Sequence, residues 1–269
     1  MAAPFLSVHI IPGYVDGFVF TWELTRNFID PAPWTFYVEQ GPAVDGPWTV
    51  LSPGLVGVAI WADNLKRVFN KNRVLFFRLR LVTTEATYYS EVITPYGDLP
   101  RRDYLIVKDI MRREILQQQK LSGVRAMLWC KSTWGTKCTA CVDPFTGDIM
   151  TSNCADCMGQ GIVPPYHGPY EIWVTFSTDQ KNTEQSAEGA GLKQDYNWTV
   201  RMIGFPYVHD NDIILDIASD KRYIVDGVAN ELEIRRVPVI QMIGVHELPV
   251  SDPAYKLNTS QEQEGCVFP

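Results

Sequence analysis

Four cysteines in two close pairs constrain the fold of this chain more than any other feature. Cys138 and Cys141 form one Cys-x-x-Cys pair, and Cys154 and Cys157 form a second after twelve intervening residues. Two pairs at this spacing supply four thiolates, the ligand set of a tetrahedral zinc ion with a closed shell. Residues 143–148 have the composition of a turn, so we expect a short hairpin that brings the pairs together. The sequence therefore predicts a structural Zn²⁺ site at these four cysteines.

A folding role is predicted for this site rather than catalysis. Four cysteine ligands leave no open position for a water molecule, and about thirty residues are too few to build a hydrophobic core of their own. A redox Cys-x-x-Cys is the alternative, but such a pair normally opens a helix, whereas Pro144 and Gly147 follow here. Cys130 is expected to be a small buried hydrophobe beside Trp129, and no role is assigned to Cys266.

Length and charge narrow the class of protein. A chain of 269 residues with 46% hydrophobic and 20% charged residues is globular and long enough for two or three units. The formal net charge of −7 repels a phosphate backbone, so specific nucleic-acid binding is not expected. The sequence has no apolar run of about 20 residues and does not start like a signal peptide, which predicts no membrane contact and a reducing cytoplasm as the folding compartment.

Residues 1–97 are expected to form an all-β sandwich of short alternating strands separated by Pro- and Gly-bearing turns. The order of its landmarks resembles a fibronectin type III domain: Trp22 comes early, Gly46-Pro47-Trp48 follows a strand, and Asp63 starts a connection. A strand with Tyr88-Tyr89 then closes the unit. Another seven-stranded sandwich is the alternative, and either one is a binding or spacing module.

Residues 98–129 are expected to form a linker built on one long amphipathic helix. Apolar residues recur at steps of three and four at Tyr104, Val107, Met111 and Ile115. Gly123 supplies a stop. The neighbouring Arg112 and Arg113 are interpreted as a solvated face, with contact to acidic partners at an assembly interface as the alternative.

The rest of the chain divides into three parts. Residues 130–165 hold the zinc-binding hairpin, residues 166–257 hold five strand-length segments that suit a small β-barrel, and residues 258–269 form a polar tail. Within the barrel part, residues 179–195 read as a mobile polar loop. The predicted fold class is therefore mainly β and multi-domain, with a sandwich, one long helix, a zinc-ribbon-like hairpin and a C-terminal barrel.

The remaining polar residues do not predict an active site. His9, His167, His209 and His246 each stand alone, and no catalytic motif or phosphate loop accompanies them. The acidic run Asp210, Asp212 and Asp216 resembles a calcium cluster but lacks the glycine and terminal glutamate of a calcium loop, so we interpret it as the exposed side of a strand. We therefore expect no catalytic residues, no organic cofactor and no enzyme activity.

Two resemblances to known families concern the second half of the chain. Cys154 to Gly161 is similar to the Cys-x-x-Cys-x-Gly-x-Gly repeat of DnaJ-type zinc domains, which implies the same metal knuckle but, with one repeat only, no chaperone activity. The helix ending at Gly123, the zinc hairpin, Asp212-Ile213-Ile214 and Tyr223-Ile224-Val225 together resemble neck proteins of tailed bacteriophages, in particular head-closure proteins. The segment 251–255 is similar to their ending.

The phage resemblance implies a structural virion protein assembled in the host cytoplasm. It implies a six- or twelve-fold ring between portal and tail, contacts with the portal and other neck or tail proteins, and a sandwich that projects as a collar-like module. The alternative is a zinc-ribbon nucleic-acid-binding or transcription accessory protein, which the acidic charge disfavours. A cell-surface or carbohydrate-binding protein is a third interpretation, disfavoured by the reducing-compartment zinc site.

Overall fold

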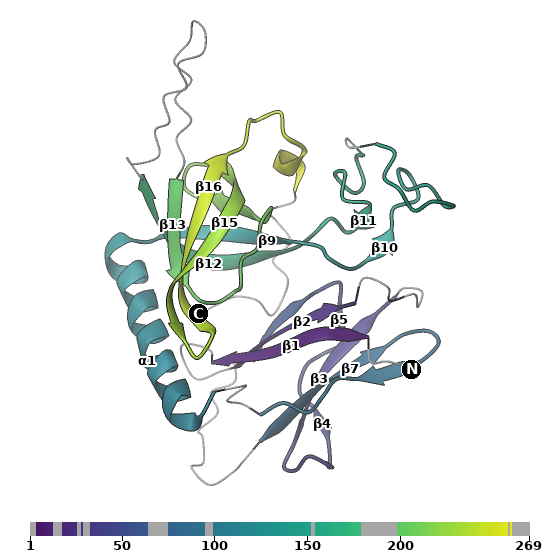
Figure 1. Ribbon diagram of the computed structural model, residues 1–269, viewed down its shortest axis with the longest axis vertical. Coiled ribbons are helices and arrows are strands. Elements are labelled where there is room, and N and C mark those ends of the chain that lie inside the picture. The colour runs from purple at the N-terminus through teal and green to yellow at the C-terminus, as the bar shows by residue number, and fades with distance from the viewer. Residues whose placement is uncertain are drawn as a thin grey trace, which may run out of the picture.

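The structure is a computed structural model that describes residues 4–12, 18–25, 28, 33–63, 75–94, 99–151, 154–178, 198–257 and 259 (Figure 1). The described part of the chain is mainly β, with one α-helix and a closed six-stranded barrel. The predicted loop 179–195, Cys266 and all of the tail 258–269 except Thr259 lie outside the described residues. None of the described helices is long and apolar enough to cross a membrane.

The first β unit consists of two sheets. One has the order β1-β2-β6, formed by Phe5–Pro12, Phe18–Leu24 and Ile60–Asp63. The other has the order β4-β3-β7-β8, with β5 also paired to β3; its strands are Thr49–Val50, Thr35–Gly41, Phe76–Val82, Thr87–Tyr89 and Leu55–Val56. All pairs are antiparallel. In the described part of residues 1–97, the predicted all-β character is confirmed.

Aromatic side chains from the two sheets fill the space between them. Phe18 and Phe20 of β2 each lie 5.3 Å from Phe77 of β7, and Trp22 lies 5.3 Å from Phe36 of β3, measured between ring centroids. These residues are almost fully buried. Strand alternation explains the arrangement, because residues at steps of two point to the same face of a sheet. Burial of such rings dominates the energetics of a core.

Helix α1, Arg101–Gln117, continues as one π-helical turn, Gln118–Ser122. The four apolar residues predicted to form its inner face are all buried (Tyr104, Val107, Met111 and Ile115). Gly123 follows, as predicted, but its backbone is not left-handed. Glycine is required there because a Cβ would lie 2.5 Å from the carbonyl oxygen of Gln118. The helix packs against the barrel strands β13 and β16 and is therefore part of the barrel unit rather than a linker.

The barrel closes in the order β12-β13-β16-β15-β14-β9, with every neighbouring pair antiparallel. Its strands are Tyr166–Thr178, Trp198–Ile203, Val237–Glu247, Lys221–Ile234, Ile213–Asp216 and Val124–Lys131. Five of them match the segments predicted in 166–257. The sixth, β9, lies in residues assigned to the linker helix and the zinc hairpin, so the predicted boundary at 166 is too late. β9 is needed to close the barrel through its pairing with β12.

The sandwich and the barrel share one continuous hydrophobic core. Trp134, which follows β9, lies 5.7 Å from Trp34 and 5.6 Å from Phe36 of the sandwich, and it stacks at 4.6 Å on His167 of the barrel. The two β units therefore meet through a packed aromatic joint.

Candidate metal centre

The four predicted metal-binding cysteines lie on an insertion between two barrel strands. The chain leaves β9, forms the short strand β10 (Thr136–Lys137), and returns through β11 (Ile162–Val163) into β12. β10 and β11 pair antiparallel and form the stem of the insertion. Figure 1 shows this hairpin extending from the barrel on the side opposite α1.

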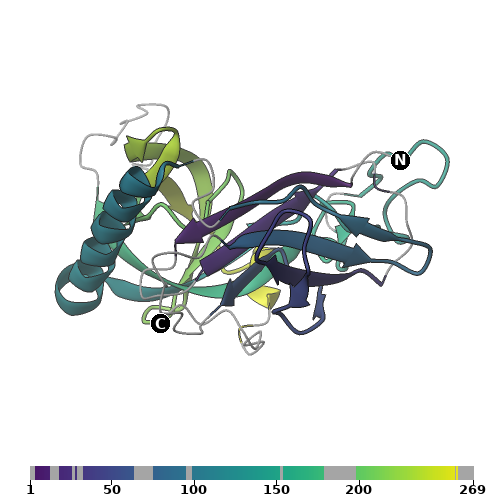
Figure 2. The ribbon, with the colours of Figure 1, turned by 90° about the horizontal axis from the view of Figure 1, so that it is seen from below.

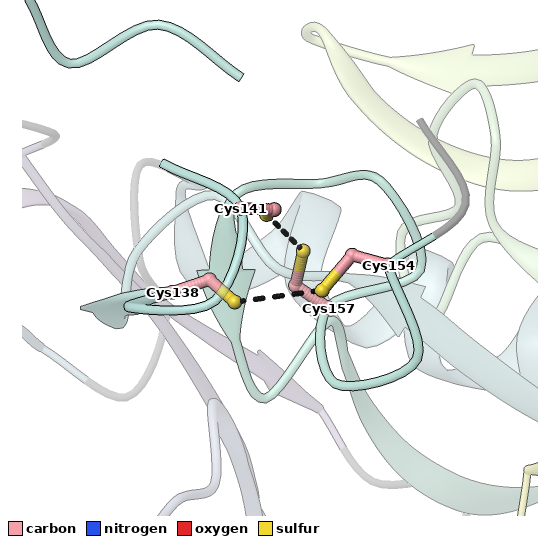
Figure 3. A group of neighbouring side chains, drawn as sticks. All are labelled: Cys138, Cys141, Cys154 and Cys157. Carbon is pink, nitrogen blue, oxygen red and sulfur yellow. Dashed lines mark hydrogen bonds between the residues drawn. The ribbon is translucent and has the colours of Figure 1, made fainter. Parts of the chain in front are cut away.

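The structure brings all four sulfur atoms together at the tip of the stem (Figure 3). They lie within 4.8 Å of one another. The Sγ atoms of Cys138 and Cys154 are 3.7 Å apart, and those of Cys141 and Cys157 are 3.1 Å apart. Cys138, Cys141 and Cys157 are buried and Cys154 is half-buried. The five cysteines in the described part of the chain are all free thiols, so no disulfide competes for these sulfurs.

Local backbone chemistry builds the two knuckles. Val142 and Ile149 form an antiparallel bridge, so the turn between them returns the chain as predicted. In the second knuckle, the backbone N–H of Gly161 donates to the sulfur of Cys157 at 3.3 Å. Gly161 has φ of 74°, a left-handed conformation that costs a residue with a Cβ about 1 kcal/mol or more. The glycine spacing of the DnaJ-like repeat thus has a local geometric reason.

The environment of the sulfurs favours thiolate at one position. The pKa of Cys154 is lowered to about 7, first because the backbone N–H of Cys157 hydrogen-bonds to its sulfur and then because that of Asp156 does the same. The pKa of Cys141 is raised, first by its hydrogen bond with the sulfur of Cys157 and then by burial. Cys154 therefore gives up its proton more readily than Cys141 does.

The donor set fits a metal ion of the Zn²⁺ type. Zinc–sulfur bonds of about 2.3 Å in a tetrahedron place sulfur atoms about 3.8 Å apart. The Cys138–Cys154 distance of 3.7 Å matches this value, and the Cys141–Cys157 distance of 3.1 Å requires a small outward movement. Among the described residues, these four cysteines form the one cluster of metal-binding side chains. They can hold a metal ion with a closed shell of four sulfurs.

Asp212 is a buried structural carboxylate rather than the exposed strand residue that we predicted. Its two oxygens accept backbone N–H groups of Lys131 at 2.7 Å and His209 at 2.8 Å. Burial raises its pKa to about 6, against the effect of those two donors. Asp216 accepts from Ala218 and Ser219 and stabilises a turn. Asp212 and Asp216 therefore hold loops of the barrel, whereas Asp210 is exposed as predicted.

Sequence reasoning missed the grouping of three of the four histidines. His9, His167 and His209 line one cavity of about 270 Å³ at the junction of sandwich and barrel. Nδ1 of His167 lies 3.2 Å from the carbonyl oxygen of Gly57, while its Nε2 has no hydrogen-bond partner among the residues that the structure describes. Burial lowers the pKa of His167 to about 4, so the imidazole is neutral at neutral pH. No sequence signal marks this grouping, because the residues come from distant strands and loops.

In comparisons with known proteins, no family model and no curated protein sequence matches this chain.

Proposed function

We propose that this chain is a structural virion protein of a tailed-phage neck. It forms a ring between portal and tail, and a Zn²⁺ ion held by its four clustered cysteines stabilises the projecting hairpin. The proposal includes a collar-like role for the sandwich, which we assign to the fibronectin type III class. The resident metal is structural, because four sulfur ligands leave no position for substrate or water.

One observation carries the proposal. The two motifs similar to head-closure proteins are Asp212-Ile213-Ile214, which leads into β14, and Tyr223-Ile224-Val225 in β15. These strands are antiparallel neighbours in a closed barrel. Ile213 pairs with Ile224 and Ile214 with Tyr223, so the motif residues form one contiguous patch of barrel wall. A barrel with a packed interior and no open sheet edge is a suitable rigid unit for a ring.

Charge supports assembly over nucleic-acid binding. The sequence from 136 to 163 contains one lysine and three aspartates, and a zinc ion with four thiolates adds a net charge of about −2. A zinc ribbon that binds nucleic acid needs a basic surface beside its knuckles. The hairpin carries a net negative charge instead, so its surface suits a protein partner.

Native mass spectrometry of the full chain tests the proposal, with and without a chelator, alone and mixed with isolated phage portal rings. We expect about one zinc per chain and either a closed ring or a zinc-loaded monomer that assembles on the portal. A filter-binding assay with duplex DNA at low and moderate salt accompanies it. The proposal is overturned, in favour of the zinc-ribbon alternative, if the chain stays monomeric, does not bind the portal and binds duplex DNA with a salt-sensitive affinity.

A further inference from the structure

The hairpin that carries the four cysteines, from β10 to β11, presents an exposed apolar tip; we call it the metal hairpin. Phe145 is 96% exposed, Met150 is 67% exposed and Ile149 is 48% exposed. Asp148 and Asp156 are also exposed on this hairpin. We call these five residues the tip surface. Apolar side chains grouped with charged residues at a protruding end are typical of a contact site.

The turn that carries Phe145 is held by several hydrogen bonds. The backbone N–H of Phe145 donates to the Asp143 carboxylate at 2.7 Å, and the N–H of Gly147 donates to the Asp143 carbonyl at 2.9 Å. The N–H of Asp143 in turn donates to the carbonyl of Asp148 at 3.0 Å. Because these bonds fix the backbone of the turn, binding through Phe145 needs little further ordering of the chain, which favours a role as an interface anchor.

The outer face of α1 is exposed, apolar and basic. Exposed residues recur at steps of four, seven and four along one stripe: Arg101, Leu105, Arg112 and Leu116. A neighbouring stripe has Arg102, Ile106 and Arg113. Leu105 is 55% exposed and Ile106 43% exposed. Residues at such spacings share one side of a helix, so arginines and apolar residues alternate over this surface, which we call the α1 outer face.

The acids near this face are already neutralised. Asp109 forms an ion pair of 2.8 Å with Arg113, and Asp103 pairs with Arg235 from the β15–β16 turn. Glu114 faces inward and pairs with Arg201. The outer face is thus locally positive in a chain whose formal charge is −7.

The two surfaces lie at opposite ends of the molecule. Figures 1 and 2 both place α1 at one end and the metal hairpin at the other. The tip surface has acidic residues around an apolar anchor, and the α1 outer face has basic residues around apolar ones. Two different complementary patches on one chain give a heterologous contact, which repeats head to tail and closes into a ring when the rotation allows.

We infer that the tip surface of one copy docks on the α1 outer face of the next copy. This inference rests on the proposed ring-forming function and names the surfaces that build the ring. Phe145 packs among the apolar residues of the helix, and the aspartates of the tip face its arginines. The metal then serves assembly, because it fixes the turn that presents the anchor.

Charge reversal on full-length, zinc-loaded protein tests the inference. The tip variant is Asp148→Lys with Asp156→Lys, which leaves the turn-forming Asp143 in place. The helix variant is Arg112→Glu with Arg113→Glu. A matched control, Asp45→Lys with Glu85→Lys, reverses two exposed acids on the sandwich. Sedimentation velocity over a concentration series measures self-association, and zinc content and circular dichroism check that each variant is folded.

We expect each reversed surface alone to weaken self-association by about 100-fold or more, because like charges then face each other. The control associates as the unmodified chain does. An equimolar mixture of the two variants regains association, since the lysines of the reversed tip meet the glutamates of the reversed helix. The unmodified tip of the helix variant likewise meets the unmodified α1 outer face of the tip variant. Phe145→Ser weakens association without changing the charge or the zinc content.

Three results would overturn the inference. In the first, the unmodified chain forms rings that neither variant affects, and ring formation itself, hence the proposed function, still stands. In the second, the unmodified chain is monomeric alone but assembles on portal rings, and both variants assemble there as it does, so the proposed function still stands. In the third, the helix variant self-associates as the unmodified chain does and differs only in its binding of duplex DNA on a filter. The α1 outer face is then a nucleic-acid-binding surface.

Discussion

Replacement of His167 should remove a defined part of the pH dependence of stability. In the folded protein burial lowers the pKa of this imidazole to about 4, whereas in the unfolded chain it is near 6.5. Between these values the unfolded state binds a proton that the folded state does not. Stability contributed by neutral His167 is therefore present above about pH 6.5 and is lost as the pH falls towards 4.

The size of the effect follows from the two pKa values. Because each tenfold change in proton affinity corresponds to about 1.36 kcal/mol, the complete loss below pH 4 is about 3 kcal/mol. From about pH 7.5 to about pH 5.5, the expected loss is about 1.3 kcal/mol. Cys154, whose pKa is about 7, also titrates in this window, but that titration is common to the unmodified protein and its His167 variants and cancels when they are compared.

Two substitutions separate titration from packing. His167→Phe keeps a ring against Trp134, and His167→Asn keeps an amide donor for the carbonyl of Gly57. Both variants lose the titrating group, so both should lose the same increment of pH dependence. Asp212, whose pKa is raised to about 6, acts in the opposite direction and stabilises the folded state on acidification. Its contribution cancels when each variant is compared with the unmodified protein.

The assay is urea unfolding followed by tryptophan fluorescence at several pH values, with direct titration of the His167 ring by NMR. The slope of unfolding free energy against pH should differ between the unmodified protein and both variants by the same amount. If both variants keep the original slope, or if the ring titrates near pH 6.5, the assignment of a buried neutral imidazole is refuted.

Three further predictions concern the metal, the backbone and the helix. Cys157→Ser should lower zinc from about one ion per chain and expose the hairpin to limited proteolysis; unchanged zinc by mass spectrometry would contradict the four-sulfur site. Gly204→Ala places a Cβ 1.9 Å from the carbonyl oxygen of Pro238 and should lower the free energy of unfolding by more than about 2 kcal/mol. Gly227→Ala meets no atom within 4 Å and should change it by no more than about 0.5 kcal/mol. Denaturant midpoints measure both effects. In the same assay, replacement of buried Met111 by Ala should lower the free energy of unfolding by about 2–5 kcal/mol. Replacement of exposed Leu105 by Ala should lower it by about 0.5 kcal/mol or less. Equal losses would be inconsistent with the orientation of the helix.

The features that the sequence predicted are those set by local spacing. The inner face of α1 follows from the period of the helix, and Tyr104 and Met111 are buried as expected. Similarly, two Cys-x-x-Cys pairs around a turn bring their sulfurs together through short-range geometry. Such patterns need no knowledge of distant partners.

The features that were missed depend on contacts between distant residues. β9 begins just after Gly123, and its role as the closing strand depends on pairing with residues such as Tyr170 and Ile214, far along the chain. Asp212 is buried because it accepts the N–H of Lys131, 81 residues away. Its charge alone suggested solvent, since an unpaired carboxylate is rarely buried. Only the closed barrel supplies the donors that make burial of this side chain tolerable.

The metal hairpin and the joint between sandwich and barrel are built on the same pair of strands. Lys131 of β9 pairs with Tyr166 of β12, so both ends of the insertion leave the barrel side by side. Trp134 on the outgoing segment stacks on His167 on the returning one, and this stack packs against the sandwich. The joint therefore sets the direction of the hairpin, and we expect a metal ion on the four sulfurs to hold its tip in order. Metal loss should then disorder the tip and leave the joint intact, whereas a change at His167 should act on the joint and leave metal binding intact.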